Sequence, residues 1–200
     1  QTCALPIYLA LGRKRARAGA LLMLALPGGA YIYQGEELSL PEVRDIPEDR
    51  LTDPRWEMSN RTDKGRDGCR VPLPWKSVKD SGFGFAGTAS LDPNDAWLPQ
   101  PEWWGNYSVE SQDKDPGSTL NMYRTALEIR REESGLGDGP MEWVDLGIDV
   151  LAFSRPGNFL CVVSFSAPVQ LPKGEILVAS APIQEMLLRS EEHTSELQSR

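Results

Sequence analysis

The 200-residue sequence contains few cysteines, no excess of positive charge and no long apolar run. Of its three cysteines, Cys3 lies near one end, and Cys69 and Cys161 are too few for a disulfide framework and lack the spacing of a metal site. The formal net charge of −8 argues against nucleic-acid binding. No segment approaches the roughly 20 apolar residues of a membrane span. The small number of cysteines favours a protein of a reducing compartment, and we expect a cytoplasmic location.

Both ends of the sequence are predicted to be foreign to the protein. Residues 189–199 (RSEEHTSELQS) correspond to codons that resemble a common sequencing-library adapter, and residues 1–7 (QTCALPI) correspond to the reverse complement of part of it. Two ends that match one oligonucleotide on opposite strands are hard to obtain by chance, although an ordinary disordered tail is the alternative. Residues 1–7 and 189–200 are therefore set aside as adapter-like artefacts, together with His193, the one histidine.

Local patterns predict two helices, a short strand and a long irregular segment. Residues 13–26 are predicted to form a helix, because residues 20–26 are continuously apolar and rich in helix formers, and Pro27, Gly28 and Gly29 end it. Residues 30–33 are an aromatic and β-branched run of strand length. Residues 36–106 are rich in Pro, Gly, Asp and Trp and show little periodicity. Residues 115–133 have the 3–4 spacing of a helix and carry Pro in the first turn.

After Pro140 the apolar period changes to two, which predicts a small antiparallel sheet. The residues 156–158 (PGN) indicate a hairpin turn. The expected strands are residues 141–146, 150–154, 159–166 and 176–179.

The motifs ALPGGAYIYQGEEL (residues 25–38), GRDGCRVPLPW (65–75), WLPQP (97–101) and DPGSTLNMYRTAL (115–127) together resemble glycoside hydrolase family 13, the α-amylase superfamily. The closest resemblance is to its α-glucosidase and oligo-1,6-glucosidase branch. Ser39 departs from the glycine usual after QGEEL, and Arg44 lies in a stretch that is usually acidic. The combination is specific, whereas each motif alone is weak.

The resemblance implies a fold of class α/β plus all-β. Residues 8–138 would be the C-terminal portion of a (β/α)8 catalytic barrel, with residues 30–33 as its last strand and a helix on either side. Residues 139–188 would be a small antiparallel β-domain that is incomplete, because its last strand is lost where the adapter-like residues begin. A long loop at the C-terminal face of a barrel would account for the irregular segment.

The resemblance also suggests residues that hold the sugar. Glu36 and Glu37 follow the predicted barrel strand, and Glu37 would support the sugar site directly or through hydrogen bonds; the alternative is that it only binds neighbouring backbone and arginine groups. Arg70 would reach the sugar in the innermost subsite, because an arginine fork suits hydroxyl and carboxylate partners. Arg66 and Asp67 would hold the loop. The alternative is a purely structural ion network of these three residues.

The aromatic residues of residues 97–104 permit two interpretations. Indoles stack on sugar faces, so Trp97, Trp103 or Trp104 could form a subsite wall. The resemblance instead places WLPQP in packing near the predicted second helix.

The implied activity is retaining hydrolysis of terminal α-linked glucose from oligosaccharides or disaccharides, by an aspartate nucleophile and a glutamic acid. Neither can be assigned in this sequence, so we assign no catalytic residue and expect the chain to be inactive alone. The alternative is a non-enzymatic carbohydrate-binding or interaction module. An intact secreted enzyme that uses Glu36 and Glu37 lacks a nucleophile with a partner. The expected ligand is a small α-glucoside, with no cofactor, metal, nucleic-acid or membrane partner; the oligomeric state and the particular glucoside stay open.

Overall fold

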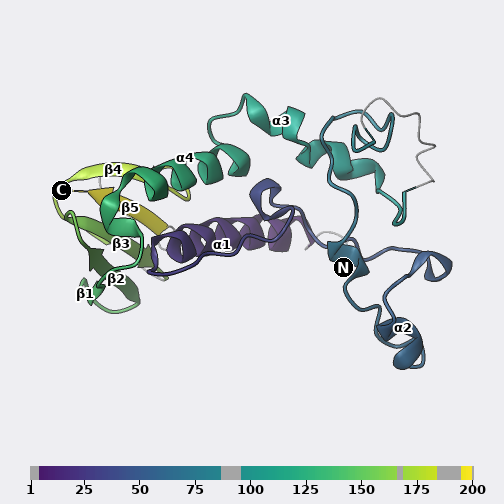
Figure 1. Ribbon diagram of the computed structural model, residues 1–200, viewed down its shortest axis with the longest axis horizontal. Coiled ribbons are helices and arrows are strands. Elements are labelled where there is room, and N and C mark those ends of the chain that lie inside the picture. The colour runs from purple at the N-terminus through teal and green to yellow at the C-terminus, as the bar shows by residue number, and fades with distance from the viewer. Residues whose placement is uncertain (1–4, 87–95, 166–168, 184–194, 200) are drawn as a thin grey trace. The chain divides into compact units, whose positions relative to one another are not determined.

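The computed structural model describes residues 5–86, 96–165, 169–183 and 195–199, and these form two compact units (Figure 1). The first, here called the helix–sheet unit, combines the residues up to Tyr33 with those from Thr119 onward. The second, here called the loop unit, is the continuous segment Gln34–Ser118. The predicted division into residues 8–138 and 139–188 does not coincide with these units and stays a prediction.

Two helices form the helical part of the helix–sheet unit: α1 spans Leu5–Ala25 and α4 spans Thr119–Glu132. Both predicted helices are confirmed, although α1 begins earlier and α4 later than expected. The start of α4 is delayed because Asp115 closes a turn, in which its carboxylate accepts a hydrogen bond from the Gly117 N–H (2.9 Å) and its carbonyl accepts one from the Ser118 N–H (3.0 Å). The predicted role of Pro116 in the first turn of the helix is therefore wrong.

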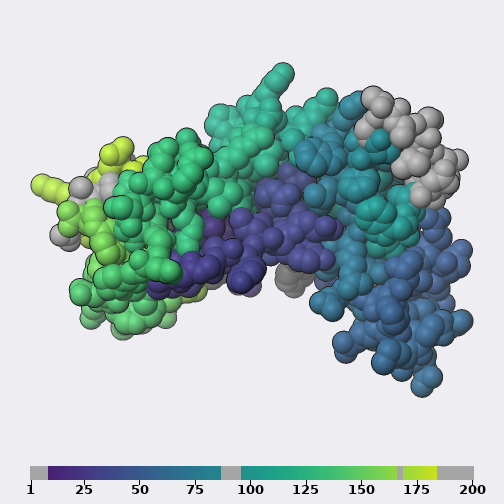
Figure 2. Space-filling model, in the orientation of Figure 1, coloured from purple at the N-terminus to yellow at the C-terminus, as the bar shows by residue number. Residues whose placement is uncertain are grey.

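The two helices pack against each other along one face of each. Figure 2 shows α4 in green lying along α1 in purple, with side chains filling the space between them. Among the described residues, no helix combines the length and the apolar character that crossing a bilayer requires. The buried side chains of the two helices include Ala20, Leu21, Leu24 and Ala25 of α1 and Met122, Tyr123 and Ala126 of α4.

The sheet of this unit is antiparallel throughout, with the strand order β1-β2-β3-β5-β4. The predicted strands are confirmed with small shifts. The first is shorter than expected, and the third ends at Ser164. The predicted end of the third strand, residue 166, lies outside the described residues. The strands are β1 Glu142–Trp143, β2 Val150–Arg155, β3 Phe159–Ser164, β4 Glu175–Ala179 and β5 Ser195–Ser199.

The predicted hairpin joins β2 to β3. Arg155 pairs with Phe159 around a three-residue turn. Gly157 (φ 83°) and Asn158 (φ 62°) adopt the left-handed backbone conformation, which glycine and asparagine tolerate best. The turn residues therefore have the conformational freedom that this connection requires.

Strand β5 lies between β3 and β4 and consists of residues predicted to be adapter-derived. Phe159 of β3 and Glu175 of β4 both pair with Ser199. This pairing does not reveal where the residues come from, because strands pair through backbone hydrogen bonds that many different sequences can make. The foreign origin of residues 1–7 and 189–200 stays a prediction.

The sheet buries side chains on both faces with a period of two. One face, with Phe153, Phe159, Cys161 and Val163, packs in the same cluster as the helices. The opposite face, with Ala152, Leu160 and Val162, forms a second cluster with Val169 and Leu171. Burial in the first cluster raises the pKa of the Cys161 thiol to about 12, because the thiolate would lose its hydration there.

Two arginines bind the carbonyls around the C-terminal end of α1, where helical carbonyls lack partners within the helix. Arg155 is 3% exposed and donates to the carbonyls of Ala25 (2.9 Å) and Gly137 (2.6 Å). Desolvation, and then the neighbouring charge of Arg130, lowers the pKa of Arg155. Positive charge at this end also complements the helix dipole. Arg130 donates to the carbonyls of Leu24, Leu26 and Gly28.

The loop unit contains only short helical turns and no strand among its described residues, as the weak periodicity predicts. Its apolar core joins side chains that are distant in sequence. These are Val43, Ile46, Val71, Phe83, Leu98 and Trp104. Its elements are η1 Glu36–Leu38, η2 Glu48–Arg50, α2 Arg55–Met58, η3 Asp67–Cys69, η4 Glu102–Tyr107 and α3 Val109–Asp113.

The predicted buried strand at residues 30–33 is wrong for this structure. The segment has no assigned strand structure, and Tyr31 (88% exposed) and Tyr33 (50% exposed) lie at the surface. A strand requires backbone hydrogen bonds to a neighbour, and among the described residues no strand pairs with this segment. The structure therefore contains helices and a small antiparallel sheet, without the barrel strand that the sequence predicts.

Candidate functional site

Glu37 lies in η1, immediately after a tight turn. Its carboxylate accepts a hydrogen bond from the Gly35 N–H (2.8 Å). Gly35 has a φ of 90°, a backbone conformation that favours glycine, and a Cβ there would lie 2.8 Å from Cδ1 of Leu40, whose side chain would have to shift. The observed contact agrees with the structural interpretation of Glu37, in which the carboxylate binds neighbouring backbone.

Asp67 begins η3 and ties two loops of the loop unit together. It is 1% exposed. One carboxylate oxygen accepts hydrogen bonds from the N–H groups of Thr52 (2.6 Å) and Asp53 (2.8 Å), and the other accepts one from the Thr52 hydroxyl (3.0 Å). Arg70 lies 3.9 Å from that second oxygen. The predicted loop-holding role of Asp67 is therefore matched by its contacts.

Asp53 joins the two arginines of the GRDGCR motif. Its Oδ2 accepts a hydrogen bond from Nη1 of Arg70 (3.1 Å) and another from the backbone N–H of Arg66 (3.0 Å). Its Oδ1 accepts one from the N–H of Arg55 (3.0 Å). The Asp53 side chain is 11% exposed and that of Arg70 is 39% exposed, so the pair lies at the edge of the unit.

The structure thus brings together two of the three predicted site residues. Arg66 and Arg70 share Asp53, Arg66 through its backbone and Arg70 through its guanidinium. Among the residues that the structure describes, no hydrogen bond or ion pair joins Glu37 to either arginine.

Sequence reasoning missed Asp53 as a site residue. The signal available was the Asp53-Pro54 dipeptide, since aspartate before proline favours a turn in which the carboxylate binds a backbone N–H two residues later. That turn is present at Arg55. The contacts with Arg66 and Arg70 cannot be read from local sequence.

The WLPQP motif is divided between packing and surface. Leu98 is buried in the core, and buried Gln100 donates to the carbonyls of Pro72 and Gly82 (3.0 Å each). Trp104 is also buried and donates to the Pro72 carbonyl (2.7 Å). These contacts confirm packing for this part of the segment, within the core of the loop unit, and the predicted place near the second helix stays a prediction.

Trp97 differs from Leu98 and Gln100 because its indole ring is exposed to solvent. It is 53% exposed, its indole N–H donates to the Arg70 carbonyl (3.1 Å), and its ring meets Phe85 edge to face at 5.4 Å between centroids. Trp97 therefore lies beside Arg70, and its predicted role as a sugar-stacking wall stays a prediction.

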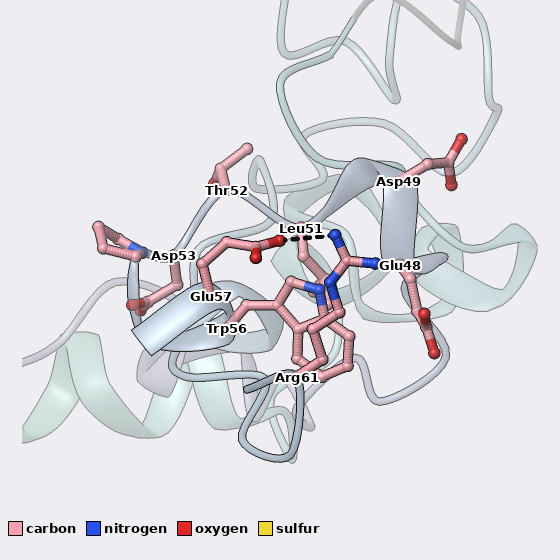
Figure 3. A pocket seen from close by; sticks show the side chains of 9 residues that line it. Glu48, Asp49, Leu51, Thr52, Asp53, Trp56, Glu57 and Arg61 are labelled. Carbon is pink, nitrogen blue, oxygen red and sulfur yellow. Dashed lines mark ion pairs between the residues drawn. The ribbon is translucent and has the colours of Figure 1, made fainter. Parts of the chain in front are cut away.

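A pocket of about 530 Å³ lies beside α2 and is distinct from the two arginines. Figure 3 shows the side chains of Glu57 and Arg61 joined as an ion pair (3.1 Å) among the residues that line it, with Asp53 at one side. Trp56 is only 7% exposed and offers no open ring face. Within the described residues no metal-binding group of three His, Cys, Asp or Glu occurs. The pocket lining is Glu48, Asp49, Leu51, Thr52, Asp53, Pro54, Trp56, Glu57 and Arg61.

Two carboxyl groups of this loop have pKa values below their ordinary range. Hydrogen bonds from the N–H groups of Arg55 and Arg66 lower the pKa of Asp53. The N–H of Gly65 and then the side chain of Arg55 lower the pKa of Asp63. Because the folded state binds fewer protons at these groups, their stabilising effect is complete above the unfolded pKa of about 4 and is lost as the pH falls through the folded pKa.

We therefore expect the loop unit to lose stability in acid. The urea midpoint, followed by tryptophan fluorescence, should be level from pH 7 to 5 and fall below about pH 4. The substitution Asp53→Asn should lower the midpoint at pH 7 and make the fall below pH 4 shallower. Identical pH slopes in the wild-type chain and the variant would show that Asp53 does not contribute.

Comparison with known proteins identifies the family. A family model described as "Alpha amylase, catalytic domain" matches residues 9–139. The "Probable alpha-glucosidase" of Rhizobium meliloti (strain 1021) is 39% identical over 140 residues, which are 70% of this chain and 24% of that protein. The oligo-1,6-glucosidase of Parageobacillus thermoglucosidasius is 28% identical over 134 residues, 58% of this chain and 22% of that protein.

The fold comparison agrees. The crystal structure of the alpha-glucosyl transfer enzyme XgtA matches with a TM-score of 0.69 and 29% identity, over 94% of this chain and 36% of that one. The chain thus spans about a quarter of the two glucosidases and about a third of the solved structure. With the family match covering residues 9–139, the chain belongs to glycoside hydrolase family 13, the α-amylase family, in its α-glucosidase and oligo-1,6-glucosidase branch.

Proposed function

We propose that this chain is the C-terminal part of a retaining α-glucosidase that releases terminal α-linked glucose from oligosaccharides or disaccharides. The observation that carries the proposal is the family match over residues 9–139, which includes Glu37, Arg66 and Arg70. The 39% identity to a probable alpha-glucosidase supports the substrate class. The nucleophilic aspartate and the acid glutamate of such an enzyme would belong to other parts of the longer protein.

Arg70 is the residue proposed to contact the sugar. Its side chain is partly exposed, and Asp53 engages Nη1. Among the described residues, its Nε and Nη2 donate no hydrogen bond. The guanidinium is planar, so when Nη1 is held by Asp53 the N–H groups of Nε and Nη2 stay in the same plane. Those N–H groups can then donate hydrogen bonds to neighbouring sugar hydroxyls.

Arg66 and Glu37 are proposed to support the sugar site indirectly. The Arg66 backbone N–H binds Asp53, and Glu37 holds the turn at Gly35. An α-glucoside is the proposed small-molecule partner, and no cofactor is assigned.

The test uses the enzyme encoded by the complete reading frame, assayed with p-nitrophenyl α-glucoside. We expect Arg70→Ala to lower kcat/KM about ten- to a hundredfold, the effect of losing a hydrogen bond from a charged group. Arg44→Ala is the matched control, because Arg44 is exposed in the same unit and its side chain pairs only with Glu42, at 3.4 Å, among the described residues. The 200-residue chain alone should show no turnover above a mock preparation.

Three results would contradict the proposal. A complete enzyme that releases no glucose would remove the function, and equal kcat/KM values for Arg70→Ala and Arg44→Ala would remove the assigned sugar contact. Binding of maltose by the 200-residue chain, with no glucosidase encoded around it, would favour the carbohydrate-binding module.

A further inference from the structure

Arg70 has two carboxylates within reach, and they differ in how fully they are already used. Asp67 accepts three hydrogen bonds from Thr52 and Asp53 and lies 3.9 Å from Arg70, beyond hydrogen-bond distance. Asp53 lies at 3.1 Å and accepts a hydrogen bond from the guanidinium itself. Asp53 is therefore the group that fixes the direction of the Arg70 side chain.

Asp53 is itself fixed from two sides. The N–H of Arg55 holds Oδ1, and the N–H of Arg66 holds Oδ2 beside the guanidinium. Its peptide N–H is in turn bound by buried Asp67. A carboxylate whose backbone and both oxygens are held leaves the guanidinium it binds little freedom to turn.

Gly65 makes room for this arrangement. With a φ of 66°, it lies so close to Asp53 that a Cβ would be 2.4 Å from Cγ and 2.7 Å from Oδ2 of that residue. A side chain at position 65 would push the carboxylate out of its place. The first glycine of the GRDGCR motif therefore leaves the space that the side chain of Asp53 occupies, although Asp53 lies outside the motif.

We propose that Asp53 is a positioning residue for the glycosidase reaction, which holds the Arg70 guanidinium in the orientation that binds the glucosyl unit. The inference rests on the proposed function of Arg70 and adds a residue that the motifs do not contain. Asp53 does not touch the sugar; it acts by fixing one nitrogen of Arg70, so that the remaining N–H groups point in set directions.

A double-mutant cycle in the complete enzyme tests this inference. Arg70→Ala, Asp53→Asn and the double variant are compared by kcat/KM on p-nitrophenyl α-glucoside. We expect each single variant to fall about ten- to a hundredfold and the double variant to be no worse than Arg70→Ala, because residues that act through one another are not additive. Gly65→Ala should reproduce Asp53→Asn.

Chemical rescue adds a readout that a merely structural role would not change. Guanidinium chloride at millimolar concentration should restore part of the activity of Arg70→Ala, because Asp53 still offers a site for the ion. The double variant should show no rescue. Asp63→Asn is the matched control: this carboxylate also holds the loop, through Gly65 and Arg55, but has no contact with Arg70. It should leave kcat/KM near the wild-type value.

The outcomes separate the inference from the proposed function. Losses that add in the double variant, or equal rescue with and without Asp53, would overturn the positioning role while leaving Arg70 as a sugar ligand. A fall in Asp63→Asn equal to that in Asp53→Asn would also overturn it, since loop stability would then explain both. An Arg70→Ala enzyme with wild-type activity would overturn the sugar contact itself, and with it the inference.

Discussion

Replacement of Asp67 by alanine is expected to lower the free energy of unfolding of the loop unit by about 3 kcal/mol. The carboxylate is 1% exposed and is the acceptor for the backbone N–H groups of Thr52 and Asp53. Alanine leaves these donors without a partner and removes the second negative charge near Arg70. Each donor that loses a buried partner costs about 1–3 kcal/mol.

Tryptophan fluorescence in a urea titration measures this effect. Five of the six tryptophans, at positions 56, 75, 97, 103 and 104, lie in the loop unit. Asp63→Ala is the control, because the Asp63 side chain is 47% exposed and its pairing with Arg55 is open to solvent. Equal urea midpoints for the two variants would show that buried Asp67 does not hold the loops together.

Gly135→Ala is expected to destabilise the helix–sheet unit by about 3 kcal/mol, the upper range for overpacking. Gly135 lies in η5 (Ser134–Leu136), and a Cβ there would be 1.9 Å from the carbonyl oxygen of Pro156. That oxygen belongs to the backbone of the β2–β3 turn. The clash can therefore be removed only if the backbone of the turn or of η5 moves.

The buried thiol of Cys161 gives a local readout for this variant. Alkylation of Cys161, followed by peptide mass spectrometry, should be faster in Gly135→Ala than in the wild-type chain, because the thiol is 0% exposed until the unit opens. Gly137→Ala is the control, since a Cβ at that position meets nothing within 4 Å. Equal alkylation rates in both variants would contradict the packing argument.

The elements that could be predicted from the sequence are those whose signal is local. Helix α1 contains a run of helix formers that Pro27 ends, the apolar residues of α4 recur every three to four positions, and those of β2 and β3 recur every two, so each stretch indicates its own conformation. The hairpin followed from Gly157 and Asn158, which have the backbone freedom that its turn uses. The loop unit was predicted only as an irregular segment, because its core joins residues without a repeating spacing.

The failures share a physical cause, which is dependence on a distant partner. Residues 30–33 have the composition of a strand, but a strand exists only when a neighbour supplies hydrogen bonds. Arg66 and Arg70 could be selected from their motif, whereas Asp53, which binds both, lies 17 residues before Arg70 and carries only a turn signal. Glu37 was selected as a site residue for its carboxylate. In the structure that carboxylate accepts a hydrogen bond from the backbone N–H of Gly35 in the adjacent turn.

The split composition of the helix–sheet unit has a consequence for synthesis on the ribosome. Leu21 and Leu24 of α1 are made before the loop unit, but they share a core with Tyr123, Phe153 and Val163, which follow only after the whole loop unit. At typical translation rates this interval is on the order of ten seconds. The loop unit is one continuous segment and can fold first. During that time the apolar side chains of α1 lack the partners that α4, β2 and β3 later supply. In that interval, chaperone binding and aggregation compete for the nascent chain.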